Sequence, residues 1–304
     1  MENARKIVHA SEEEIFPYTG KGITTAVLDS GVSLHPDLEG RITAFHDFVN
    51  RRKYFYDDNG HGTHVAGCLA GSGKCSHGKF AGIALQSRLV VCKILDENGE
   101  GCASAMLEAL EWILQKRKLY NIKILNISVG VDRPVESEWI QEVSFMLRKA
   151  WDAGILPVVS AGNKGPAEDS ISELGKLEYV IAVGCYDGNT DYNIKKCEDY
   201  SGRGSIASRY RKPDLVAPGT GIVSCNAFFK RLPGDRTENA YVRMNGTSMA
   251  VPIVCGAVSL LWQKKPDLSN HEVRRRLLKT AQDLHKPSNY QGWGLLDVKK
   301  LLEI

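Results

Sequence analysis

The chain is organised around one stretch, Met244-Asn245-Gly246-Thr247-Ser248-Met249-Ala250-Val251-Pro252, which places a serine between a turn and an apolar run. Gly246 lies in the turn, where a residue without a side chain can adopt backbone angles that others avoid. The apolar run continues to Trp262 at helical spacing and predicts a buried helix. A helix start offers unpaired N–H groups and a positive dipole end. Ser248 therefore suits either a nucleophile whose reaction forms an oxyanion or an ordinary helix cap.

Length and composition are those of a globular protein. The chain has 304 residues, of which 43% are hydrophobic and 25% charged. Its net charge of +3 is too small to indicate binding to nucleic acid or to an anionic membrane. No apolar run is long enough to span a membrane, and residues 1–15 lack the apolar part of a secretory signal. We therefore expect neither nucleic acid nor membrane as a partner, and the oligomeric state is left open.

Eight cysteines are spread over the chain, and none of them forms a C-x-x-C pair. This spacing does not indicate a zinc site or a redox motif. Cys92 and Cys255 lie inside apolar runs, where a free cysteine packs like a small hydrophobic residue. Since a chain of this size does not need disulfides, we expect mostly reduced thiols and a cytoplasmic protein. A secreted protein from which a signal and a pro-segment had been removed is the alternative.

Short apolar runs alternate with amphipathic segments along the chain. The runs predict buried strands at residues 23–28, 88–95, 122–127, 155–160 and 179–184. Helices are expected at residues 104–118, 137–153, 269–278 and 295–302. This alternation indicates a parallel sheet covered by helices on both faces. Because no repeat or linker is present, we expect an irregular lead-in over residues 1–20 and a single domain over residues 21–304.

Three further polar residues lie at predicted strand ends or helix starts, where open α/β sheets place functional groups. Asp29 follows the first strand, and Asn163 follows the strand at 155–160. His61 opens a helix of small residues together with His64, without the H-E-x-x-H pattern of a zinc site. Taken singly, these residues have commoner roles as a turn aspartate, a structural histidine and a loop asparagine.

Together with Ser248, the same three residues supply the parts of a serine hydrolase. A serine nucleophile needs a base for its proton, and the base needs a carboxylate that fixes its tautomer. The oxyanion needs hydrogen-bond donors aimed at it. Ser248 would be the nucleophile, His61 the base and Asp29 the carboxylate, and they occur along the chain in the order Asp, His, Ser. The side-chain amide of Asn163 would donate to the oxyanion.

Five blocks of the sequence resemble the signature blocks of the subtilisin-like serine proteases. One block is only suggestive, but five in the family's order over nearly the whole chain leave coincidence very improbable. The resemblance implies a three-layer α/β/α fold with a mostly parallel, twisted sheet of roughly seven strands. The blocks are Asp29-Ser30-Gly31, His61-Gly62-Thr63-His64-Val65-Ala66-Gly67, Asn126-Ile127-Ser128-Val129-Gly130, Ala161-Gly162-Asn163-Lys164-Gly165 and Asn245-Gly246-Thr247-Ser248-Met249-Ala250-Val251-Pro252.

The resemblance implies a serine endopeptidase that works through an acyl-enzyme. Ser248 would be the nucleophile, His61 the general base and Asp29 the residue that orients His61. Asn163 would form the oxyanion hole with the backbone N–H of Ser248, and His64 would be structural. Protein or peptide substrates would bind as an extended strand along Gly99, Glu100, Gly101, Ser128, Val129, Gly130, Ala161, Gly162 and Ser172.

The sequence departs from the family at the N-terminus and at a calcium loop. Only 28 residues precede Asp29, too few for the family's usual pro-segment. Asp37 matches a calcium ligand of the family, but the loop at 71–80 brings two lysines and no carboxylate. We therefore expect no metal at this loop and no required cofactor, while a carbonyl-based site for calcium or a monovalent cation near residues 175–180 is left open.

Substrate preference can be inferred only from position and charge. Ala103 stands where relatives have an aromatic lid, which would leave the P4 pocket open. Lys164 beside Asn163 favours an acidic P1 residue, and Glu100 favours basic residues further away. Glu173-Leu174 replaces the aromatic–proline pair of relatives in a segment that should line the P1 pocket, so the P1 preference is left open.

Two alternatives come from other classes of protein. A catalytically weak or inactive subtilisin-fold module could bind peptides, since fold does not imply function. Degenerate relatives lose a triad residue, however, and this chain keeps Asp29, His61, Ser248 and Asn163. An acyl hydrolase of the α/β-hydrolase type is disfavoured, because G-x-S-x-G is absent around Ser248 and the order of the triad residues differs.

Overall fold

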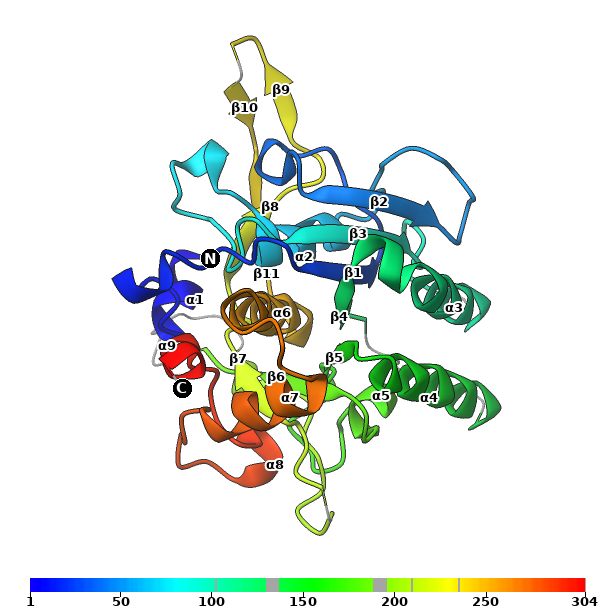
Figure 1. Ribbon diagram of the computed structural model, residues 1–304, viewed down its shortest axis with the longest axis vertical. Coiled ribbons are helices and arrows are strands. Elements are labelled where there is room, and N and C mark those ends of the chain that lie inside the picture. Colours follow the sequence, from blue (N-terminus) through cyan, green and yellow to red (C-terminus); the bar gives the residue numbers. More distant parts are fainter. Residues whose placement is uncertain (102, 130–136, 188–195, 209, 235, 304) are drawn as a thin grey trace.

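A seven-stranded parallel sheet forms the centre of the computed structural model, which describes residues 1–304 except 102, 130–136, 188–195, 209, 235 and 304 (Figure 1). Across the sheet the strands follow the order β2-β3-β1-β4-β5-β6-β7. The bounds are β1 Thr24–Asp29, β2 Ile42–Asp47, β3 Arg88–Lys93, β4 Ile122–Ile127, β5 Leu156–Ser160, β6 Ile181–Cys185 and β7 Leu215–Ala217. The parallel sheet predicted from the apolar runs is therefore present.

The strand order places β1 at the point where the chain changes direction across the sheet. The chain forms β2 and β3 on one side of β1 and then crosses to form β4 on the other side. Asp29 of β1 pairs with Lys93 of β3, and Leu28 pairs with Ile127 of β4. The carboxyl ends of three strands therefore meet at one edge, and ligands bind beside such an edge in open α/β sheets.

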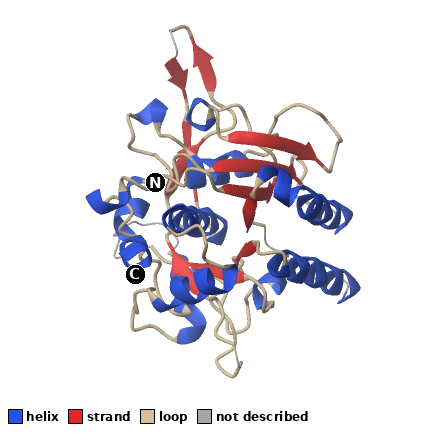
Figure 2. Ribbon diagram, in the orientation of Figure 1, coloured by secondary structure: helices blue, strands red, loops and turns tan. Residues whose placement is uncertain are grey.

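Helices cover both faces of this sheet (Figure 2). One apolar cluster joins α2 and α6 to one face, and a second joins α3 and α4 to the other. Helix α6 is buried from Thr247 to Trp262, as expected of a helix that is apolar on all sides. The α-helices are α1 Glu2–Ile7, α2 His61–Ala70, α3 Ala103–Tyr120, α4 Ser137–Asp152, α5 Glu173–Lys176, α6 Thr247–Lys264, α7 Asn270–Lys279, α8 Ser288–Gln291 and α9 Val298–Glu303. Single 3-10 turns are η1 Glu13–Ile15, η2 Pro36–Leu38, η3 Lys74–Ser76 and η4 Cys197–Asp199.

The predicted strands and helices are confirmed, with shifts of a few residues at their ends. Helix α7 begins with the predicted capping box, because the backbone N–H groups of Ser269 and Glu272 each donate to the other's side chain. Three layers, α/β/α, result from this arrangement, as the sequence predicted.

Strand β2, the hairpin at residues 230–238 and the short helices α5 and α8 were not predicted. Strand β2 is an edge strand whose residues are mostly half-exposed, so it lacks a continuous apolar run. Strands β9 (Lys230–Leu232) and β10 (Arg236–Glu238) form an antiparallel hairpin that projects beyond the sheet (Figure 1). It extends from a second antiparallel pair, β8 (Ile222–Cys225) and β11 (Tyr241–Met244). All residues of β9 are exposed, so burial leaves no pattern in the hairpin sequence.

Residues 1–20 are not the irregular lead-in that we expected. They contain α1, and Met1, Ala4 and Val8 are buried in the same apolar cluster as α6. The α-amine of Met1 donates to the carbonyl of Val223 at 3.0 Å, and the N–H of Val298 donates to the carbonyl of Val8 at 2.9 Å. The near-helical spacing of the three apolar residues was the overlooked signal. This segment packs onto the domain instead of leading into it.

Two cysteines are an exception to the expectation of mostly reduced thiols. Cys185 at the end of β6 and Cys197 are joined by a disulfide. The free thiols of the described part of the chain belong to Cys68, Cys75, Cys92, Cys225 and Cys255. Cys102 lies outside the described residues. The expectation therefore agrees with five cysteines and is wrong for this pair.

Candidate active site

Asp29 and His61 form a direct contact at the carboxyl end of β1. The Nδ1 of His61 lies 2.7 Å from Oδ1 of Asp29, and the same oxygen accepts the N–H of Ser30 at 2.8 Å. The Asp29 side chain is fully buried, whereas the His61 side chain is 25% exposed. The ring is therefore held on one side by a buried carboxylate and open to a ligand on the other.

The start of α2 is fixed by a second aspartate, Asp57. Its carboxylate accepts the N–H of Gly60 at 2.8 Å, and the N–H and hydroxyl of Thr63 at 2.8 and 2.6 Å. The N–H groups at a helix start have no partner within the helix, and Asp57 supplies one for them. Gly62 must be a glycine, because a Cβ there would lie 2.2 Å from the carbonyl oxygen of Gly31. The close approach brings the His61 turn against the end of β1.

Ser248 is the second residue of α6 and is 8% exposed. Gly246 before it has φ 144°, a conformation that side-chain-bearing residues rarely adopt, and its N–H donates to the carbonyl of Gly219 at 2.9 Å. Helices α2 and α6 pack against each other. Within the described residues no hydrogen bond joins the Ser248 hydroxyl to His61. Such bonds are often long without substrate.

The side chain of Asn163 reaches the same helix start from the end of β5. Its Oδ1 accepts the backbone N–H of Thr247 at 3.0 Å and the Thr247 hydroxyl at 3.1 Å. A backbone N–H can only donate, so its partner must be the amide oxygen and not the nitrogen. This fixes the orientation of the exposed amide and leaves its two N–H groups as donors beside Ser248.

The two histidines of α2 have opposite electrostatics. Burial alone lowers the pKa of His61, but the charge of Asp29 and its hydrogen bond outweigh burial, so the net pKa is raised above 6.5. Burial lowers the pKa of His64 to about 3. The His64 Nε2 lies 3.0 Å from the carbonyl of Ile222. His64 is therefore a neutral residue of the packed helix, and only His61 can exchange a proton near neutral pH.

Two backbone edges lie beyond these side chains. Residues 95–101 form a tight loop in which Asp96 accepts the N–H groups of Asn98 and Glu100, and Leu95 forms a bridge with Gly101. Ser128 and Val129 follow β4, and the Ser128 hydroxyl accepts the side-chain N–H of Asn126 at 2.9 Å. Gly130 lies outside the described residues, as does the side chain of Ala103.

The remaining predicted substrate residues lie together at the end of β5. The N–H of Ser172 donates to the carbonyl of Ala161 at 2.8 Å, and its hydroxyl donates to the carbonyl of Ser160 at 2.7 Å. Gly162 has φ 87° and approaches the Ser172 Cβ closely. The backbone of this pair of segments is therefore fixed next to Asn163.

Two charged residues of the site were not identified from the sequence as functional. Asp57 was noted only as part of a polar turn, and Lys93 only as part of a strand. A lysine inside the otherwise apolar run of β3 was the available signal, since a buried ammonium needs partners.

With this geometry in place, the family model described as "Subtilase family" matches residues 20–294. The chain belongs to the subtilase family. It is by that membership a subtilisin-like serine endopeptidase, in agreement with the resemblance of its five blocks.

Individual subtilases show how far the similarity extends. The chain is 39% identical to "Serine protease AprX" of Bacillus subtilis over 91% of its own length and 64% of the length of that relative. It is 32% identical to "Subtilisin DY" of Bacillus licheniformis over 96% and 95% of the two chains. Among solved structures, "Sphericase" has a TM-score of 0.78 at 28% identity, with 92% of each chain covered. In the described part of this subtilase, no helix is long and apolar enough to cross a membrane.

The oxygens of Asp37, which matches a calcium ligand of the family, already have protein donors. Both oxygens of Asp37 already accept hydrogen bonds, one from the N–H of Cys75 at 2.9 Å and one from the Tyr241 hydroxyl at 2.8 Å. The adjoining loop at 71–80 contains lysines and no carboxylate. A hard cation with six to eight oxygen ligands has no comparable set here.

The carbonyls near residues 175–180 are also in use. The buried ammonium of Lys212 donates to the carbonyls of Leu177 and Val180 at 2.8 and 3.3 Å, and to Asp214 at 2.7 Å. The Lys212 ammonium thus supplies the positive charge that a bound cation would otherwise bring to these carbonyl and carboxylate oxygens.

We expect that removing divalent cations leaves the stability of this subtilase unchanged. Dialysis against excess EDTA should shift Tm by less than about 2 °C, because protein donors already satisfy these oxygens. The measurement is calorimetry with and without added calcium. A fall of many degrees that calcium reverses, and that disappears in Asp37→Ala, would contradict this expectation.

Proposed function

We propose that Asp29, His61 and Ser248 are the catalytic triad of this subtilase and that Asn163 completes its oxyanion hole. The observation that best supports the proposal is the 2.7 Å contact between His61 Nδ1 and buried Asp29. In this contact Nδ1–H donates to the carboxylate, which leaves Nε2 as the basic nitrogen. A tautomer fixed in this way is what a serine nucleophile requires.

The reaction follows from these positions. His61 Nε2 takes the proton of the Ser248 hydroxyl as the oxygen attacks the scissile carbonyl, and the bond between Oγ and the carbonyl carbon forms. The imidazolium is stabilised by Asp29 and then gives its proton to the leaving amine. Water repeats the sequence on the acyl-enzyme and releases the acid. At each tetrahedral stage the oxyanion accepts hydrogen bonds from the N–H of Ser248 and the amide of Asn163.

Substrate is proposed to bind as an added strand between the two backbone edges. Gly99, Glu100 and Gly101 are proposed as one edge, and Ser128 and Val129 as the described part of the other. Main-chain hydrogen bonds of this kind give affinity with little sequence selectivity. Ala161, Gly162 and Ser172 are proposed to line the pocket of the residue before the scissile bond, and Lys164 at its rim favours an acidic residue there.

The cellular compartment is proposed from the cysteines. Five free thiols in the described chain support a reducing, cytoplasmic environment. The Cys185–Cys197 bond is the observation that favours secretion instead.

A fluorophosphonate probe tests the assignment of the nucleophile directly. Folded protein should be labelled stoichiometrically, with the adduct mapped by mass spectrometry to Ser248. The same preparation should cleave an internally quenched peptide library within chains and not only at their ends. Folded protein that is neither labelled nor active would instead support the inactive peptide-binding module.

Replacing Asn163 should lower turnover without weakening substrate binding. Asn163→Leu should reduce kcat about 10²–10³-fold, the loss known for the corresponding donor of subtilisin. KM should change little, because the oxyanion exists only in the transition state. A tenfold rise in KM at constant kcat would mean that Asn163 binds substrate in its ground state. Thermal unfolding of the variant controls for the lost Thr247 contacts.

A further inference from the structure

Lys93 at the end of β3 has no exposed surface, although lysine is rarely buried completely. Removing an ammonium from water costs several kcal/mol unless partners satisfy all of its donors. A buried lysine next to a proposed catalytic centre therefore calls for an explanation by its contacts. The sheet register places Lys93 directly beside Asp29.

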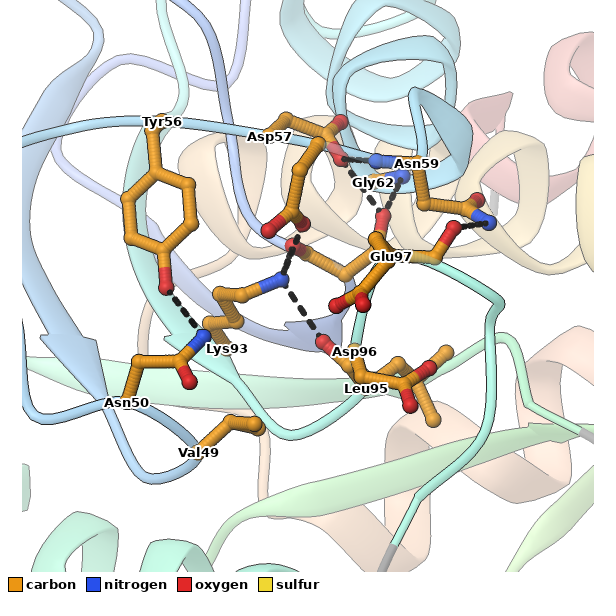
Figure 3. A network of polar contacts seen from close by, with 12 residues as sticks. Val49, Asn50, Tyr56, Asp57, Asn59, Gly62, Lys93, Leu95, Asp96 and Glu97 are labelled. Carbon is orange, nitrogen blue, oxygen red and sulfur yellow. Dashed lines mark hydrogen bonds and ion pairs between the residues drawn. The ribbon is translucent and has the colours of Figure 1, made fainter.

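The three N–H groups of the Lys93 ammonium are each matched by an oxygen. Figure 3 shows Lys93 between Tyr56 and Leu95. Nζ lies 2.5 Å from Oδ1 of Asp58, 2.7 Å from the carbonyl of Ser30 and 2.7 Å from the carbonyl of Leu95. The ring of Tyr56 lies 4.9 Å from the ammonium on a further side. The charge is thus compensated by one carboxylate, and every donor is used.

Each of these three oxygens belongs to a different part of the proposed site. Ser30 follows Asp29, and its N–H donates to the Asp29 carboxylate. Its hydroxyl accepts the N–H of Gly62 and donates to Asp57 at 2.8 Å. Asp58 adjoins Asp57, which holds the start of α2. One ammonium therefore connects the segment after Asp29 with the segment before His61.

The third oxygen extends this connection to the substrate edge. Leu95 is the first residue of the loop 95–101, and its bridge to Gly101 closes that loop. The N–H of Ile94 donates to the carbonyl of Asp29 at 2.8 Å. A shift of the Lys93 head would therefore move both the catalytic pair and one edge of the substrate strand.

The charges near His61 give this arrangement an electrostatic consequence. The elements packed against α2 carry the charged side chains Asp29, Asp37, Arg88, Lys93 and Lys264, and Asp57 and Asp58 directly precede α2, whereas His64 of α2 is neutral. The buried thiols of α2, β8 and α6 remain neutral, because burial raises their pKa. Lys93 and Asp58 form a compensated pair. Loss of either member alone leaves one uncompensated charge beside the catalytic pair.

We propose that Lys93, paired with Asp58, is a positioning residue that couples the Asp29–His61 pair to the substrate-binding loop 95–101. The proposal rests on the function proposed above for Asp29 and His61. Lys93 is not assigned any contact with substrate. It acts through the backbone of Ser30 and Leu95 and through the charge of Asp58.

The test is a double-mutant cycle of Lys93→Met and Asp58→Asn, followed by the pH profile of kcat/KM. Removing the positive charge should raise the midpoint of the acidic limb by about 0.5 unit or more, and removing the negative charge should lower it similarly. The double variant should return toward the wild-type midpoint. Shifts of both single variants in the same direction, or no shift in either, would overturn the proposal.

Substrate length tests the coupling to the loop. For Lys93→Met, the loss in kcat/KM should be at least several-fold greater with a peptide that spans the strand edge than with a single-residue ester. Equal losses with both substrates would refute the coupling. If Lys93→Met does not fold, Asp58→Asn still tests the electrostatic part, because the Asp58 side chain is 29% exposed and its amide can still accept from Lys93.

Lys212→Met is the matched control. Lys212 is also a buried lysine held by two carbonyls and one aspartate, but it lies at the far side of the sheet beside β7. Its loss should lower Tm without moving the acidic limb. A shift equal to that of Lys93→Met would show a general effect of buried charge and refute the proposal. Wild-type protein that no fluorophosphonate labels would refute the proposed function instead.

Discussion

Ser248→Ala should abolish fluorophosphonate labelling and lower kcat by about 10⁶, the loss known for the serine of subtilisin itself. The reason is that no other group can form the covalent acyl intermediate once the hydroxyl is absent. The variant should fold normally, since alanine favours a helix and the first turn of α6 uses no hydrogen bond of the Ser248 side chain. Activity is measured with a quenched peptide, and folding by thermal unfolding.

Ser259 provides a matched control for that substitution. It lies on the same helix, is fully buried, and donates its hydroxyl to the carbonyl of Cys255 at 2.9 Å. Ser259→Ala removes a hydroxyl of the same helix and should leave labelling and kcat unchanged. Labelling that persists in Ser248→Ala, or that is lost in Ser259→Ala, would contradict the assignment of the nucleophile.

The sheet and its helices were predictable because buried strands and helices require apolar residues at regular positions in the sequence. Every residue of β1 is buried, and the run from Ile23 to Leu28 carries no charged residue. Helix α6 is apolar on all sides for the same reason. Strand β2 and the β9–β10 hairpin are exposed or half-exposed, and their pairing depends on neighbours distant in the sequence. Periodicity could not reveal them.

In the candidate site, too, some residues were predictable from the sequence and others were not. The sequence identified Asp29, His61 and Asn163 because each ends a strand or starts a helix within a characteristic block. It did not identify the partners of Lys93, because Ser30, Asp58 and Leu95 converge only when β1 and β3 pair. The residues that hold a catalytic pair in place are therefore harder to predict than the pair itself.

The disulfide illustrates a further limit of sequence spacing. Cys185 and Cys197 are twelve residues apart and match no motif. The end of β6 and the turn η4 bring them together, and the hydroxyl of Tyr200 lies 3.2 Å from the sulfur of Cys185. The fold, and not a motif along the chain, determines which cysteines meet.

Asp29→Asn should lower kcat by about 10⁴ and move the acidic limb of the pH profile to lower pH. The amide can donate to Nδ1 and so favours the wrong tautomer of His61. Loss of the carboxylate charge and hydrogen bond also removes what raises the pKa of His61 above 6.5. By linkage, the raised pKa stabilises the fold fully below pH 6.5, and this contribution is lost as pH rises through the folded pKa. Asp29→Asn should therefore lower Tm more at pH 6 than at pH 9.

Asp37→Asn separates this effect from the general cost of changing a buried aspartate. Asp37 is 1% exposed, accepts bonds from Cys75 and Tyr241, and is not among the charges that raise the pKa of His61. Asp37→Asn should lower Tm by the same amount at pH 6 and at pH 9. The acidic limb of the pH profile of activity should not move. If Asp29→Asn kept full turnover, or if both variants shifted the limb alike, Asp29 would not be the residue that orients His61. Because the limb reports ionisation of the free enzyme and Tm reports folding, the two measurements together distinguish orientation of the base from support of the fold.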